Sequence, residues 1–133
     1  MKSIRASVIV LIVAASMSLA ARVDIGVDTI LRNRLWLFVP GEWFSPKAAW
    51  HNYGDTAAGF LAWFRLYHPL DSLVYSESLQ VSSLGPGSSD TLVFPDYQFP
   101  GSGIWTARCS TAASGDTSQA NDTLSCQLWA EWG

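Results

Sequence analysis

Charged residues, cysteines and histidines are all scarce in this chain, and the composition excludes several classes of protein. Only 14% of the 133 residues are Asp, Glu, Lys or Arg, and the chain has two cysteines and two histidines. With 49% hydrophobic and 13% aromatic residues, the composition excludes a disordered chain, a collagen-like repeat and a coiled coil. The length is that of one hydrophobic core. The sequence therefore predicts a single weakly charged, aromatic-rich domain.

The N-terminal segment has the pattern of a secretory signal peptide. Lys2 and Arg5 precede an apolar stretch over residues 6–15, and small residues then form a cleavage site after Ala20. The stretch is too short, and too often interrupted by serine, for a membrane-spanning helix. We therefore expect no integral membrane segment after cleavage.

The remainder of the chain is acidic and has no basic cluster. The formal net charge of the whole chain is −3, and it becomes −5 without the two basic residues of the leader. Nucleic acid and anionic membrane surfaces are therefore not expected partners. We predict a signal peptide over residues 1–20 and one domain over residues 21–133. The product is expected to be secreted, extracellular or attached to the cell surface, with the periplasm as a further possibility.

Alternation of apolar and polar residues predicts a series of β-strands. In the first strand, Ile25, Val27, Thr29 and Leu31 share the inward face. A proline cannot donate to a strand ladder, so Pro46 marks an edge strand or a bulge. The expected strands are Ile25–Leu31, Leu35–Val39, Trp43–Asn52, Ala58–His68, Leu73–Ser82, Thr91–Phe94, Ile104–Thr111 and Thr123–Trp132.

These strands are separated by turn signals about every ten residues, and no stretch has a convincing helical period. The segment Ala58–His68 is apolar on both faces, which is typical of a central strand. The pattern predicts an all-β protein with an immunoglobulin-like antiparallel β-sandwich of about seven strands.

Three segments in this order and spacing resemble a known family. They are Asp24–Leu31, Pro46–Gly54, and Trp105–Thr111 with the Asn121-Asp122-Thr123 turn that follows it. Over about residues 23–131, the chain resembles the CARDB module, the cell-adhesion-related domain found in bacteria. The resemblance implies an immunoglobulin-like module of exported and surface proteins that is not an enzyme and serves in adhesion or as a spacer.

Tryptophan is the most over-represented residue type, with seven in the chain. A sandwich of this size buries about three or four, so the others are expected to cover the ends of the sandwich or to bind a partner. We place the contact surface at Trp36, Phe38, Trp129 and Trp132. A protein partner or self-association is the leading interpretation. The alternative is a carbohydrate-binding accessory module whose exposed tryptophans stack on sugar rings.

Cys109 and Cys126 fall on the same inward face of the last two predicted strands. If these strands form a hairpin, the two side chains are expected to lie opposite each other. An exported pair of cysteines favours a disulfide, whereas two buried free thiols are an equally ordinary outcome. Both alternatives remain open.

Oxygen-bearing side chains gather in the last loop, at Asp116, Asn121 and Asp122. Such ligands suit calcium, but their spacing is not that of an EF-hand, and capping of turn backbone is the favoured interpretation. The two histidines, His51 and His68, lie beside turns. No Gly-x-Ser-x-Gly or His-Glu-x-x-His motif accompanies them. We therefore expect neither an enzyme nor a cofactor.

Overall fold

The computed structural model describes residues 21–32, 37–116 and 121–132. All the secondary-structure elements in this part of the chain are β-strands. Three strands have only two residues, namely β2 (Leu37–Phe38), β3 (Trp43–Phe44) and β8 (Tyr97–Gln98). The same part of the chain holds no helix that could cross a membrane. The seven longer strands are β1 (Ile25–Leu31), β4 (Lys47–Asn52), β5 (Ala58–Tyr67), β6 (Leu73–Leu84), β7 (Ser89–Val93), β9 (Gly103–Ala112) and β10 (Thr123–Ala130).

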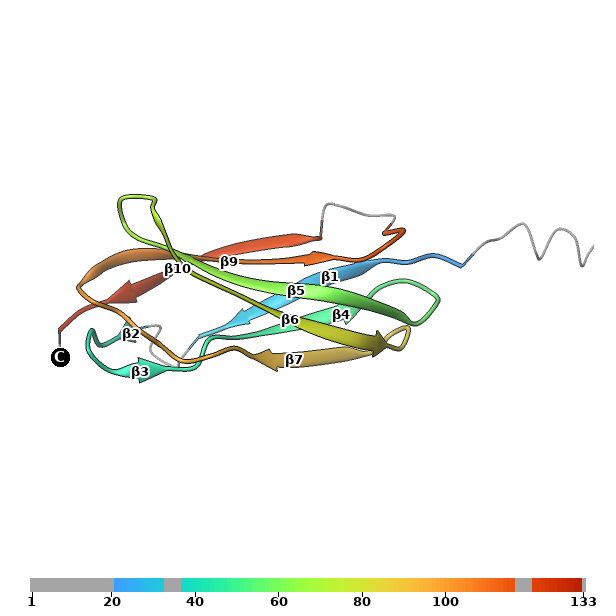
Figure 1. Ribbon diagram of the computed structural model, residues 1–133, viewed down its shortest axis with the longest axis horizontal. Coiled ribbons are helices and arrows are strands. Elements are labelled where there is room, and N and C mark those ends of the chain that lie inside the picture. The colour runs from blue at the N-terminus through green and yellow to red at the C-terminus, as the bar shows by residue number, and fades with distance from the viewer. Residues whose placement is uncertain (1–20, 33–36, 117–120, 133) are drawn as a thin grey trace, which may run out of the picture.

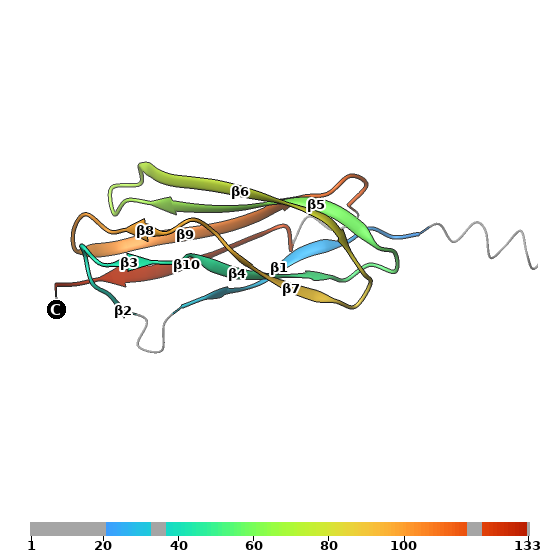
Figure 2. The ribbon, with the colours of Figure 1, turned by 60° about the horizontal axis from the view of Figure 1, so that its bottom comes forward.

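Two main sheets pack face to face as a β-sandwich (Figure 1). One sheet has the order β1-β4-β7 and the other β2-β10-β9-β5-β6, while β3 and β8 form a separate pair. Among the described strands, only β2 and β10 pair in parallel. Figure 2 shows β3 and β8 at the end of the sandwich where β10 finishes. The predicted immunoglobulin-like sandwich is confirmed.

The core forms where the inner faces of the two sheets meet. Along β5, buried residues alternate with half-buried ones from Phe60 to Tyr67, as a strand with one face on the core requires. Trp50 of β4 is fully buried, and the ring of Phe94 lies 5.9 Å from Trp50 and 5.5 Å from Phe64. The expected central position of β5 is confirmed, because it lies between β6 and β9.

A second cluster of rings fills the end of the core beside β3 and β8. Phe44 and Phe99 stack with their centroids 5.0 Å apart and their planes within 4° of parallel. Phe38 lies 4.8 Å from Phe44, and Trp105 lies 5.1 Å from Phe99. Phe44 is half-buried in this cluster, and the other three rings are buried.

The inward face predicted for the first strand is wrong beyond Val27. The register of β1 with β4 shifts between Val27 and Thr29, which leaves Asp28 as an extra residue. After such a bulge the side chains exchange faces. Ile30 therefore points inward and is 6% exposed, whereas Leu31 is 43% exposed.

The predicted strand Trp43–Asn52 is divided at Pro46 into β3 and β4. Since β4 lies between β1 and β7, it is a central strand and not an edge. The proline, which is fully buried, precedes the first residue of β4 and so takes no part in the central ladder.

Candidate functional site

The end of the sandwich where β10 finishes has exposed large apolar side chains, and we call the surface formed by Leu37, Trp43, Ile104, Trp129 and Trp132 the aromatic end. The register pairs Trp129 with Leu37 on one side and with Ile104 on the other. Directly paired residues of neighbouring strands point to the same face, so these three form a row across β2, β10 and β9. The exposed fractions are Leu37 37%, Trp43 67%, Ile104 47%, Trp129 52% and Trp132 66%.

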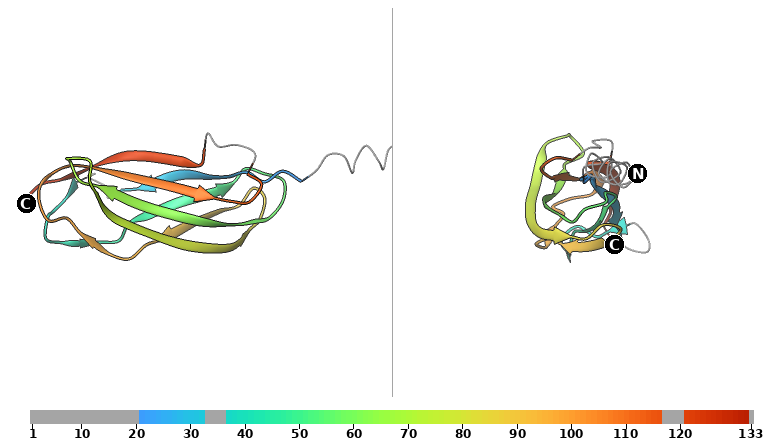
Figure 3. Two further views of the ribbon diagram at one scale, coloured as in Figure 1. Left: turned by 45° about the horizontal axis from the view of Figure 1, so that its top comes forward. Right: turned by 90° about the vertical axis from the view of Figure 1, so that its right-hand side faces the viewer.

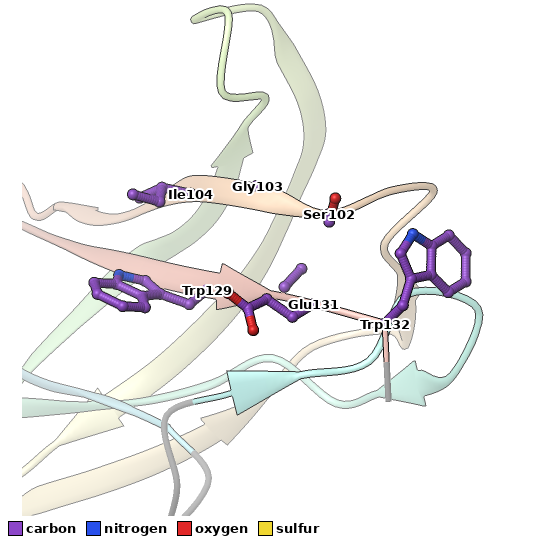
Figure 4. A pocket seen from close by; sticks show the side chains of 7 residues that line it. Ser102, Gly103, Ile104, Trp129, Glu131 and Trp132 are labelled. Carbon is purple, nitrogen blue, oxygen red and sulfur yellow. The ribbon is translucent and has the colours of Figure 1, made fainter.

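A hollow of about 510 Å³ opens beside this row. Figure 4 shows Trp129 and Trp132 at its two ends, with the carboxylate of Glu131 between them. Gly103 is required in its wall, since its φ is +143° and an added Cβ would lie 2.6 Å from Cγ of Pro69. The lining residues are Ser102, Gly103, Ile104, Trp129, Ala130, Glu131 and Trp132.

A second hollow, of about 200 Å³, lies under Trp43. It reaches down to Phe38 and Phe44 of the buried ring cluster, and Glu42 is its one charged lining residue. Each hollow therefore combines exposed aromatic or aliphatic surface with a single carboxylate, which is a surface suited to binding rather than to acid–base chemistry.

The sequence located part of this surface. Trp129 and Trp132 are exposed, as expected, whereas Trp36 lies outside the described residues. Phe38 is only 9% exposed, and its ring packs on the buried cluster, so its predicted surface position is wrong. Its neighbour Leu37 takes the surface position instead, because successive residues of a strand point to opposite faces. Trp43 and Ile104 were missed, although both belonged to predicted strands.

The two cysteines lie on neighbouring strands but are not opposite each other. Cys109 pairs with Leu124, and Cys126 pairs with Ala107, which makes the two cysteines diagonal neighbours on the inward face. Both are free thiols in the structure. Burial raises the pKa of each thiol; the nearby Cys126 adds to the rise at Cys109, whereas Arg32 opposes it at Cys126. Neither thiol is activated for chemistry.

Asp116 and Asn121 of the last loop form hydrogen bonds to residues at the start of β1. The N–H of Ile25 donates to Oδ2 of Asp116 at 3.2 Å, and Nδ2 of Asn121 donates to Oδ1 of Asp24 at 2.9 Å. The first contact satisfies a backbone N–H of strand β1, and the second joins two side chains, so the capping of turn backbone stays a prediction. No group of three or more His, Cys, Asp or Glu within the described ranges is placed to hold a metal ion.

Crowding of carboxyl groups in this loop alters the protonation of Asp122. Desolvation, the charge of Asp116 with its hydrogen bond, and the charge of Asp24 raise the pKa of Asp122 to about 6. All three effects favour the neutral carboxyl group. The loop therefore changes its charge in mildly acidic solution.

Neither histidine is among the residues that line the two hollows. Nδ1 of His68 accepts a hydrogen bond from the N–H of Leu70 at 3.0 Å within a turn. His51 is half-buried on β4, where its Nδ1 lies 2.6 Å from Oγ of Ser89. Both environments are ordinary structural settings for histidine.

The sequence matches no family model and no curated protein. Among solved structures, it matches the CARDB domain of a Pyrococcus furiosus protein in complex with di-metal ions, with a TM-score of 0.57 and 11% identity. The match covers 84% of this chain and 88% of that chain. The chain has the CARDB fold. The expected resemblance is thus confirmed at the level of the fold.

The CARDB fold of this chain also matches regions of two larger enzymes. One is a cycloisomaltooligosaccharide glucanotransferase from Paenibacillus sp., with a TM-score of 0.60, 19% identity and coverage of 86% of this chain and 14% of the enzyme. The other is a β-glucosidase from Erythrobacter marinus, with a TM-score of 0.55, 13% identity and coverage of 82% of this chain and 16% of the enzyme. In each case the shared fold is a small part of the enzyme chain.

Proposed function

We propose that this protein is a non-catalytic module that binds another protein, or a second copy of itself, through the aromatic end. The observation that carries the proposal is the exposure of three tryptophans, each more than half accessible, within one surface. Tryptophan is enriched among the residues that dominate binding energy at protein interfaces. A contiguous exposed apolar surface is also typical of an interaction site.

The make-up of the aromatic end supports association with a protein. Its centre is the apolar row Leu37–Trp129–Ile104, and carboxylates occur only at Glu42 and Glu131 in the adjoining hollows. An apolar centre with a polar surround is the usual anatomy of a protein interface. The binding role also agrees with the comparisons, in which the shared fold is a small part of each enzyme.

Export to the cell surface or the medium completes the proposal. It rests on the leader pattern of residues 1–20 and on the resemblance to CARDB modules. Adhesion or spacing within a surface assembly is the role that this combination supports.

The test is the solution mass of the purified chain, measured by light scattering over a concentration series. We expect a concentration-dependent dimer or larger assembly that Trp129→Ser and Trp132→Ser each weaken. Val93→Ser is the matched control, because Val93 is 54% exposed on β7 of the other sheet. If the chain is monomeric throughout the series, self-association is excluded. If the tryptophan variants assemble as the unaltered chain does, the aromatic end is not the interface.

A carbohydrate-binding accessory module is the second candidate function. It is favoured by the matches to regions of a glucanotransferase and a β-glucosidase, and by the exposed ring of Trp129, which can stack on a sugar. Affinity electrophoresis of the purified chain in gels containing neutral or acidic polysaccharide tests this function directly. Retardation by a polysaccharide supports it, and unchanged mobility in every gel contradicts it.

A further inference from the structure

On the outer face of the five-stranded sheet, strands β5, β9 and β10 carry basic residues and no acidic ones. Figure 3 (left) shows β10, β9, β5 and β6 side by side in this sheet. The chain as a whole has 11 acidic and 8 basic residues. Yet the outward residues of β5, β9 and β10 include two arginines and no Asp or Glu: Leu61, Trp63, Arg65, Tyr67, Ile104, Thr106, Arg108, Ser110, Thr123, Ser125, Gln127 and Trp129.

The two arginines, Arg65 and Arg108, are directly opposite each other on β5 and β9. Like charges in this position repel each other and destabilise the pair of strands. Within the described residues, no carboxylate contacts either guanidinium group to offset the repulsion. We call the surface centred on this pair the arginine face.

Neutral contacts hold the two guanidinium groups in place. The guanidinium of Arg65 lies over the ring of Trp63, 4.3 Å from its centroid, and its Nη1 donates to Oγ of Ser110 at 3.3 Å. The guanidinium of Arg108 lies 5.1 Å from the ring centroid of Tyr67, and its Nε donates to Ser125 at 3.2 Å. Stacking on a ring fixes the plane of a guanidinium group. Each guanidinium group has five N–H donors, and most of those of Arg65 and Arg108 stay available to an anion.

The side chains around the arginine pair carry hydroxyl and amide groups. On β9 and β10 these are Thr106, Ser110, Ser125 and Gln127, and on β6 the residues paired with Arg65 and Trp63 are serines. A protein interface has an apolar centre, whereas here the centre is charged and its surround can both donate and accept hydrogen bonds. Such a surround matches the hydroxyl groups of a sugar polymer, and a broad sheet face suits an extended one.

We propose that the arginine face binds an acidic polysaccharide whose sugar units carry carboxylate groups. The carboxylates lie between Arg65 and Arg108, which bind them through paired N–H donors. The neighbouring serines, threonine and glutamine bind the sugar hydroxyls. This inference rests on the second candidate function and makes its ligand specific. It does not require protein association at the aromatic end, whose Ile104 and Trp129 lie on the same outer sheet face.

The experiment is calorimetric titration of the purified chain with polygalacturonate at low ionic strength, with neutral dextran and poly-L-glutamate as comparison polymers. We expect binding to polygalacturonate that weakens as salt is added, because the contact is between charges. Arg65→Gln and Arg108→Gln should each weaken binding about tenfold or more, since each removes a charge-assisted hydrogen-bonding group. Lys47→Gln is the matched control, because Lys47 is exposed on β4 of the other sheet.

Each contrary result is informative. Unchanged binding in the Arg65→Gln/Arg108→Gln double variant, once thermal unfolding shows that the variant folds, overturns the assignment to the arginine face. Equal binding of dextran overturns the requirement for acidic sugars and leaves the carbohydrate-binding function standing. If neither polysaccharide binds, the result contradicts both the acidic ligand and the carbohydrate-binding function. Equal binding of poly-L-glutamate overturns the choice of a polysaccharide as ligand.

Discussion

Removal of the Asn52 side chain should reveal how strongly a single polar residue joins the two sheets. Asn52 ends β4 and is fully buried. Its Nδ2 donates to the carbonyl of Thr56 at 2.9 Å and to that of Leu84, in β6 of the other sheet, at 2.8 Å. Its Oδ1 accepts from the N–H of Gly54 at 2.9 Å. Every hydrogen-bonding group of this amide but one lone pair is thus accounted for.

The substitution Asn52→Ala deletes these three hydrogen bonds and leaves one backbone partner buried, at Leu84, and two part-buried, at Gly54 and Thr56. At about 1 kcal/mol for each bond, the free energy of unfolding should fall by about 3 kcal/mol. For a domain of this size, a loss of that magnitude lowers the midpoint of thermal unfolding by on the order of 15 °C. It is a large part of the stability of a typical domain.

Chemical denaturation monitored by tryptophan fluorescence measures this loss. Gln80→Ala is the matched control, because Nε2 of Gln80 also donates to two carbonyls, those of Phe60 and Val81, but from an exposed position. We expect the control to lose less than about 1 kcal/mol, since water replaces its contacts. Equal losses in the two variants would refute the reasoning, because burial would then not govern the cost.

Two further predictions concern protonation and thiol reactivity. Because the pKa of Asp122 is raised from 3.8 to about 6, the folded chain binds more protons than the unfolded chain between these values, and stability falls as the pH rises through this window. Asp122→Asn should remove that part of the pH dependence and stabilise the chain at pH 7; urea midpoints from pH 4 to 7 that shift in parallel for both proteins would contradict this. Since burial raises the pKa of both Cys109 and Cys126, neither should react with a thiol reagent on mixing, and both should react in denaturant. A count of fewer than two thiols in denaturant would indicate a disulfide in the purified protein.

Alternation in the sequence was sufficient to predict the class of fold and the central place of β5. It failed where pairing between strands decides the outcome. The extra residue Asp28 exists only in relation to β4, so the sequence of β1 alone gave no reason to turn Ile30 inward and Leu31 outward. The same holds for Cys109 and Cys126, because the register of β9 with β10 depends on the path of the loop between them.

The candidate site was predictable only in part for a related reason. The run from Leu35 to Val39 is apolar throughout, so no alternation distinguished the buried Phe38 from the exposed Leu37. The ring of Phe38 packs inward on Phe44 of β3 and on Phe99, which follows β8 and is distant in sequence. The arginine face was hidden for the same reason, since Arg65 and Arg108 are 43 residues apart and meet through the register of β5 with β9.

The bulge at Asp28 also bears on how copies of this chain meet. β1 is an edge of the three-stranded sheet, and the unpaired backbone of an edge strand can template growth by another chain. Here the N–H of Val27 already donates to the carbonyl of Asn121 at 2.9 Å, and the extra residue increases the local twist just beyond it. This edge is thereby unsuited to open-ended fibril growth. Strand addition by a second copy is thereby directed to the other sheet edges, which are β7, β2 and β6.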